Sequence, residues 1–210
     1  MKTFIKVCIF FVSVVMIFSC KDEPTPFKTP ESVMYFNGVV NSFEKAIVEG
    51  ENGYRYASED SCAVLDLGAT WFARAFMYQG NSNYFMSNRE SFGLSFHNLF
   101  DTVMTNRDSV INAYFASMPF AFSDSVIGPD DYYHGAEVTW VDGSGNYFTS
   151  LHTPQTNGMT IDQFSMSLGA SGRVMRIESS FACTLYSMDA KKTISITGAK
   201  ARVVFNTSCY

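Results

Sequence analysis

The sequence predicts an all-β protein. We expect an antiparallel β-sandwich of the immunoglobulin-like or jelly-roll kind with one short helix, with a lipocalin-like β-barrel as the alternative. Three observations predict this. Residues 174–186 alternate between apolar and polar side chains. Turn-forming Asn-Gly and Asp-Gly pairs separate several strand-like segments. Aromatic residues make up 16% of the 210 residues, which excludes disorder for most of the chain.

The clearest predicted strand covers residues 174–186, because its apolar side chains share one parity. They are Met175, Ile177, Phe181, Cys183 and Leu185. This pattern predicts one buried face and one solvated face. Shorter alternating segments predict strands over 92–96, 193–197 and 201–205, with Gly198 as a bulge between the last two. Residues 69–78 are strand-like with apolar side chains on both faces. In total we expect roughly eight to ten strands.

Three hairpin turns are predicted. Asn37-Gly38 and Asn52-Gly53 favour turns because both residue types tolerate positive φ. Residues 142–145 read Asp-Gly-Ser-Gly, and pairing 142 with 145 would place Trp140 opposite Tyr147. The same segment resembles the start of an EF-hand calcium loop. Its position 12 is Thr153 instead of Glu, so a hairpin turn is the better interpretation.

One segment has helical spacing. Its apolar residues are Val110, Ile111, Tyr114, Phe115 and Met118. Asp108 precedes them as a predicted N-cap, and Pro119 would end the helix. We expect this short helix to pack over an end or an edge of the sheet.

The first 19 residues have the composition of a secretory signal peptide. Lys2 and Lys6 are followed by an apolar run over 7–18, which is shorter than the roughly 20 residues that span a bilayer. The run ends in Ile17-Phe18-Ser19-Cys20, which resembles the lipobox of bacterial lipoproteins. The resemblance implies that residues 1–19 are removed and that the Cys20 thiol carries lipid.

The residues after Cys20 extend the resemblance. Lys21, Asp22 and Glu23 are similar to the export signal of surface-exposed lipoproteins of the Bacteroidota. The chain thus resembles the small β-rich lipoproteins of that group, which implies an outer-membrane protein that faces the cell exterior. Three of six prolines lie in 21–30, so residues 20–31 are expected to form a stiff, extended tether. Residues 32–210 are expected to form a single domain.

Charge and cysteine content limit the partners. The chain has 15 basic and 20 acidic residues; loss of Lys2 and Lys6 leaves 13 against 20, a formal −7. An acidic chain without basic blocks excludes a nucleic-acid partner and leaves the lipid anchor as the expected membrane contact. Cys62, Cys183 and Cys209 remain after processing, an odd number that allows one disulfide without indicating a pairing.

The densest polar and aromatic cluster is the candidate ligand-binding segment. It consists of Asp130, Asp131, Tyr132, Tyr133 and His134, which together could hold a sugar or a cation, or could form an exposed turn. His97 and His152 form no metal-ligand motif, and Glu137 and Glu178 are expected on solvated strand faces. We therefore predict no catalytic residue, metal or cofactor. Trp71 and Trp140 are interpreted as core residues.

These observations predict a lipid-anchored protein that binds a glycan or a partner protein without catalysis. Two alternatives remain open. One is a structural accessory of an envelope assembly, and the other is an enzyme whose site forms only in three dimensions. An extended aromatic surface would favour glycan binding, whereas a pocket that includes His97 would favour an enzyme.

Overall fold

The computed structural model describes residues 33–65, 68–79, 89–100, 107–116, 121–122, 135–151, 155, 158–169 and 172–207. Within these residues the fold is all-β, with ten strands in one antiparallel sheet and one short helix. The strands are β1 (Tyr35–Val40), β2 (Phe43–Val48), β3 (Tyr54–Leu65), β4 (Gly68–Gln79), β5 (Ser91–Phe100), β6 (Gly135–Val141), β7 (Tyr147–Thr149), β8 (Thr160–Gly169), β9 (Gly172–Ser187) and β10 (Thr193–Thr207). The helix is α2 (Arg107–Ala116).

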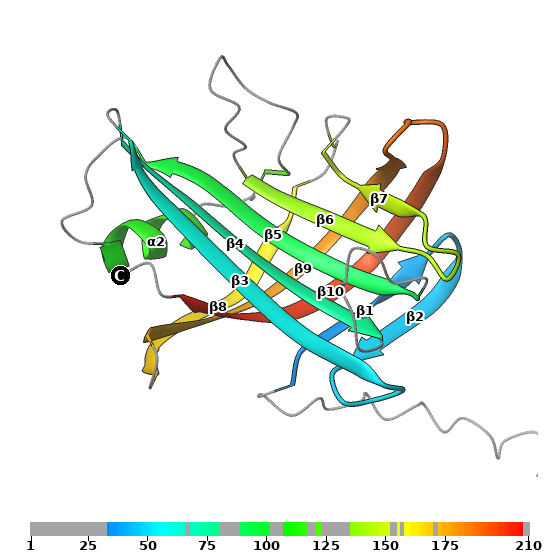
Figure 1. The fold of residues 1–210 in the computed structure, drawn as a ribbon, viewed down its shortest axis with the longest axis horizontal. Coiled ribbons are helices and arrows are strands. Elements are labelled where there is room, and N and C mark those ends of the chain that lie inside the picture. The colour runs from blue at the N-terminus through cyan, green and yellow to red at the C-terminus, as the bar shows by residue number, and fades with distance from the viewer. Residues whose placement is uncertain are drawn as a thin grey trace, which may run out of the picture. The chain divides into compact units, whose positions relative to one another are not determined.

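The sheet curves until its two ends come near each other. The strand order is β2-β1-β10-β9-β7-β6-β5-β4-β3, with β8 added beside β9 (Figure 1). The terminal strands β2 and β3 follow each other in the chain and are joined by the turn at 49–53, where Tyr54 N donates to Glu51 O at 2.9 Å. Farther along, Val204 N of β10 donates to the Tyr56 hydroxyl of β3 at 3.2 Å. The antiparallel sheet is therefore nearly closed.

The long strand β9 confirms the predicted alternation. Its predicted apolar residues, from Met175 to Leu185, are all buried, and the intervening side chains are half-buried. In β10 the register shifts between Ile196 and Ala199, around Gly198 with φ +57°. This bulge changes the parity of the buried residues, so that Ile194 and Ile196 and then Ala201, Val203 and Phe205 all face the core.

The prediction for Asn37-Gly38 is wrong. These residues lie inside β1, and the β1–β2 turn is formed by Asn41 and Ser42, with φ of 48° and 70°. Gly38 is needed for close packing instead, since a Cβ there would lie 3.0 Å from the Ala199 Cα. The predicted turn at Asn52-Gly53 is confirmed, with both residues at positive φ.

The predicted register of the β6–β7 hairpin is also wrong by one residue. Trp140 pairs with Phe148, and Val141 pairs with Tyr147. The turn is longer than expected, because Asp142 N donates to Asn146 O at 3.0 Å and residues 142–146 form the loop. A shift of one residue changes the face of each side chain. It places Trp140 and Phe148 together on the inner face.

The helix is confirmed, although it begins at Arg107, so Asp108 lies in its first turn and not at the N-cap. There Asp108 forms an ion pair with Arg173 of β9 at 2.7 Å. Ile111 and Phe115 are buried against the sheet, and the Phe115 ring stacks on Phe164 of β8 at 4.7 Å. Met118 and Pro119 lie outside the described residues. No helix in the described part of the chain has the length and apolar character needed to cross a membrane.

Candidate functional site

The residues predicted from sequence for anchoring and ligand binding lie outside the described residues. This applies to Cys20, Lys21, Asp22 and Glu23, and to the segment Asp130, Asp131, Tyr132, Tyr133 and His134. The same holds for His152, Cys209 and the side chains of Cys62 and Trp71. Their roles stay predictions.

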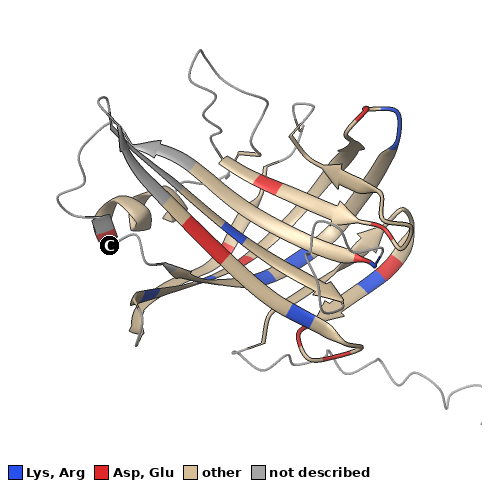
Figure 2. Cartoon of the chain, in the orientation of Figure 1, with Lys and Arg blue, Asp and Glu red and all other residues tan. Residues whose placement is uncertain are grey.

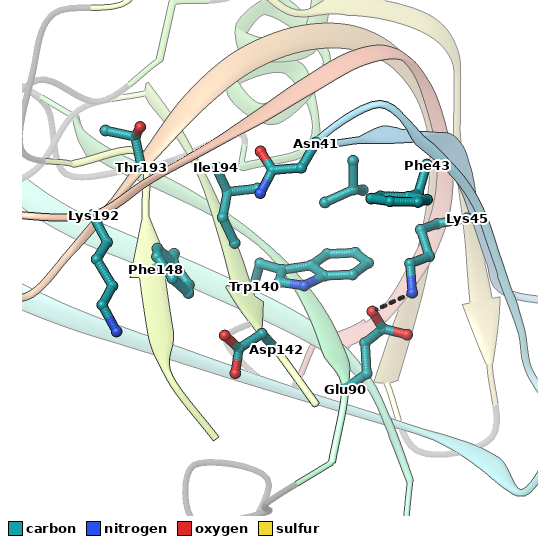
Figure 3. Close-up of a pocket in the computed structure, with 11 residues that line it drawn as sticks. Asn41, Phe43, Lys45, Glu90, Trp140, Asp142, Phe148, Lys192, Thr193 and Ile194 are labelled. Carbon is teal, nitrogen blue, oxygen red and sulfur yellow. Dashed lines mark ion pairs between the residues drawn. The ribbon is translucent and has the colours of Figure 1, made fainter. Parts of the chain in front are cut away.

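The described residues instead form a cavity of about 550 Å³ at one end of the nearly closed sheet (Figure 3). We call it the end cavity. This volume is typical of a site for a small ligand. The residues come from four separate parts of the chain: Val40, Asn41, Phe43, Lys45, Glu90, Trp140, Asp142, Phe148, Lys192, Thr193 and Ile194.

The base of the end cavity is apolar and closed. Val40, Trp140, Phe148 and Ile194 are all buried, with Trp140 only 2% exposed. Below them the Phe36 ring lies 5.4 Å from the Trp140 ring and 4.5 Å from the Phe92 ring. Because these aromatic rings pack under the base, the cavity is a shallow site at the end of the sheet. A ligand there meets both the base and the solvent.

The rim carries one exposed aromatic side chain and several charges. Phe43 is 70% exposed beside the β1–β2 turn. Lys45 forms an ion pair with Glu90 at 2.8 Å, and the Tyr54 hydroxyl donates to the other Glu90 oxygen at 3.4 Å. Burial, together with the Glu90 carboxylate, raises the pKa of Tyr54 to about 12, so this phenol stays a donor at neutral pH. The rim therefore offers fixed polar groups around an aromatic base.

Asp142 has its carboxylate tied into its own turn. One oxygen accepts from Ser144 N and Asn146 N, both at 2.9 Å, and the other accepts from Asn146 Nδ2 at 2.8 Å. Burial alone would raise the pKa of Asp142, but these hydrogen bonds and nearby Lys192 outweigh it and hold the pKa below its ordinary value. Asp142 thus fixes the shape of the β6–β7 turn.

We expect Asp142→Ala to lower the free energy of unfolding at pH 7 by about 1 to 2 kcal/mol, because three hydrogen bonds to the turn are lost. A lowered pKa adds stability above the ordinary value of about 3.9, and this contribution disappears as the pH falls. The difference between the two proteins should therefore shrink from pH 7 to pH 3 in urea unfolding. Asp142→Asn keeps an acceptor without the charge, so its loss should depend less on pH. A difference that grows in acid would contradict this role.

A second polar cluster lies on the outer face and corrects the expectation for Glu137. Glu137 lies on β6, where Figure 2 shows an acidic residue, but it is only 4% exposed, not solvated. Its carboxylate accepts from the Thr149 hydroxyl at 2.7 Å and from the Tyr147 hydroxyl at 3.5 Å. His97 Nε2 lies 3.5 Å from the other oxygen. These neighbours on the same sheet satisfy the buried carboxylate, so the cluster is explained as structural.

Glu178 is half-buried on the outer face of β9 and forms an ion pair with Arg202 of β10. Arg202 donates to one of its oxygens through Nη2 at 2.8 Å and Nε at 3.1 Å, and the Tyr35 hydroxyl donates to the other at 3.0 Å. Burial would raise the pKa of Glu178, but these hydrogen bonds lower it overall. Glu178 thus links β9, β10 and β1.

Cys183 is a free, buried thiol within the described residues, as its place in the strand pattern predicts. Burial raises its pKa to about 12, so it stays protonated at neutral pH. Among the residues that the structure describes, no group of three or more His, Cys, Asp or Glu side chains is arranged to hold a metal ion. Comparison of the chain with protein-family models, with curated proteins and with solved structures finds no match.

Proposed function

We propose that this protein is anchored by lipid on Cys20 to the outer membrane, faces the cell exterior, and binds a short glycan in the end cavity without catalysis. The observation that carries the binding proposal is the aromatic base of the end cavity beneath a polar rim. The anchor and the location rest on the lipobox-like sequence and on Lys21, Asp22 and Glu23.

The chemistry of a sugar matches this arrangement. A pyranose has an apolar face of C–H groups that packs on an aromatic ring, and a rim of hydroxyls that need hydrogen-bond partners. Phe43 supplies exposed aromatic surface beside the buried Trp140, while Asn41, Lys45 and Lys192 supply polar groups around it. The shallow depth favours one or two sugar units that remain attached to a longer chain in solvent. A fatty ligand is disfavoured, because Phe36 and its neighbours fill the space under the base.

For the architecture we propose the closed, lipocalin-like barrel over the immunoglobulin-like or jelly-roll sandwich. Three features support it: the strands belong to one continuous sheet, the terminal strands β2 and β3 are joined by a short turn, and Tyr56 bonds to Val204 across the remaining gap. In such a barrel the end cavity would be the mouth. The predicted segment 130–134 stays proposed as a second glycan contact.

Binding is tested on a glycan array with the mature lipidated protein in detergent, followed by titration of the best ligand. We expect Phe43→Ala to weaken binding about 2- to 10-fold, since one exposed stacking ring is lost. The matched control is Leu168→Ala, because Leu168 is 83% exposed on β8 and does not line the end cavity. Equal losses in both variants, or no glycan bound by the parent protein, would reject the proposal.

The anchor is tested by metabolic labelling with palmitate. We expect the parent protein to incorporate label and to sediment with membranes, and Cys20→Ala to do neither, because acyl chains supply the membrane affinity. Protease treatment of intact cells should then remove the parent protein. Label that persists in Cys20→Ala would reject the anchor, and a protein untouched on intact cells would reject the exterior location.

A further inference from the structure

Each carboxylate oxygen of the end cavity, and the Asn41 amide oxygen, already has a partner within the protein. Glu90 accepts from Lys45 with one carboxylate oxygen and from Tyr54 with the other. Both Asp142 oxygens accept from the β6–β7 turn. The Asn41 side-chain oxygen accepts from Ser195 N at 3.0 Å. The carboxylates in the rim therefore offer little to a ligand that brings donors or a positive charge.

The donors of the same cavity are largely unused. Within the described residues, Lys192 Nζ has no ion pair or hydrogen bond, and neither Asn41 Nδ2 nor Trp140 Nε1 donates a hydrogen bond. Figure 3 shows the Asn41 amide nitrogen on the side of Ile194 and Trp140, and the oxygen that accepts from Ser195 N on the opposite side. An ammonium group has three donors and no acceptor. The unmet bonding capacity of the cavity is thus mainly that of donors.

One of the donors without a hydrogen-bond partner, Lys192, is positively charged. Lys192 precedes β10 and lines the cavity beside Phe148, whereas Lys45 on the opposite side is neutralised by Glu90 (Figure 3). Lys192 lies close enough to Asp142 and Asp189 for its charge to favour their ionised forms. Neither carboxylate forms an ion pair with it. Asp189 instead lies 3.7 Å from Lys191. Among the described residues, Lys192 is therefore a cation without a direct ion pair beside an apolar base.

We infer that the end cavity selects an acidic sugar, whose carboxylate binds Lys192 while its ring packs on the aromatic base. This inference rests on the proposed glycan-binding function and adds the charge of the ligand. The carboxylate accepts from the Lys192 ammonium, and neighbouring oxygens of the sugar accept from Asn41 and Trp140. A neutral sugar would bring no counter-charge to the exposed Lys192 ammonium.

The test compares two disaccharides that differ in one group: a β-linked glucose disaccharide, and the same disaccharide with glucuronic acid as its terminal residue. Both are titrated into the mature lipidated protein in detergent by calorimetry at low salt. We expect the acidic disaccharide to bind about 3- to 10-fold more tightly, and added salt to reduce this preference. Lys192→Met should abolish the preference between the two disaccharides.

Lys191→Met is the matched control, because Lys191 is adjacent, exposed and paired with Asp189, and it does not line the cavity. It should leave both affinities unchanged. Equal affinity for the two disaccharides in the parent protein would overturn the acidic-sugar inference while the glycan proposal stands. A preference that survives Lys192→Met would overturn the role of Lys192. If neither disaccharide binds and no glycan is captured on an array, the proposed function itself fails.

Discussion

Phe36→Ala is expected to lower the free energy of unfolding by about 3 to 5 kcal/mol, the largest loss that we predict. Phe36 is completely buried on β1, and its ring contacts the rings of Phe92, Trp140 and Phe181 at centroid distances of 4.5, 5.4 and 6.5 Å. These partners come from β5, β6 and β9, on different sides of the curved sheet. Alanine would leave a void that strands already tied to their neighbours cannot fill.

The measurement is urea unfolding of the mature protein, followed by far-ultraviolet circular dichroism. Phe43→Ala serves as the control, because it removes the same side chain from the neighbouring strand β2 at a position that is 70% exposed. Its effect should stay within about 0.5 kcal/mol. A loss below about 1 kcal/mol for Phe36→Ala would show that the site collapses around the missing ring, contrary to the rigid packing described here.

Local patterns predicted strands such as β9 and β10, because the burial of their side chains follows an alternation within their own sequences. The alternation from Met175 to Leu185 and the parity change at Gly198 both follow from side chains a few residues apart. Turn positions were harder to predict. Asn37-Gly38 has the sequence of a hairpin turn, but Gly38 is required where β1 crosses close to Ala199 of β10, and this long-range contact determines its place. The observed turn is instead formed by Asn41 and Ser42, both of which have positive φ.

The end cavity could not be predicted from the sequence. Its residues come from 40–45, 90, 140–148 and 192–194, and none of these segments carries a recognisable binding motif. The one-residue register of the β6–β7 hairpin decides whether Trp140 faces Phe148 or Tyr147, and hence what forms the base. The burial of Glu137 could not be predicted either, because it too depends on residues from other strands. A charged residue on the outward-facing side of a strand is expected to be solvated. In the folded chain, however, Thr149, Tyr147 and His97 lie around Glu137.

Gly93→Ala is expected to lower the free energy of unfolding by about 1 to 3 kcal/mol through steric overlap. Gly93 is in the middle of β5, and its cross-strand partners are Phe76 of β4 and Thr139 of β6. A Cβ at this position would overlap the Thr139 hydroxyl oxygen and would lie 2.9 Å from Phe76 Cδ1. Thr139 pairs with Thr149, whose hydroxyl donates to the buried Glu137, so Thr139 cannot move without disturbing that cluster. Urea unfolding at pH 7 measures the loss.

The origin of that loss can be tested with a double-mutant cycle. Thr139→Ala removes the hydroxyl that a new Cβ would meet, so adding it to Gly93→Ala should cost at least about 1 kcal/mol less than the sum of the two single losses. Gly143→Ala is the control, since nothing lies within 4 Å of its added Cβ; it should be neutral or stabilise by up to about 1 kcal/mol. Strictly additive losses would mean that Gly93 is required for its backbone freedom, because a steric cause must depend on the group with which the new methyl collides.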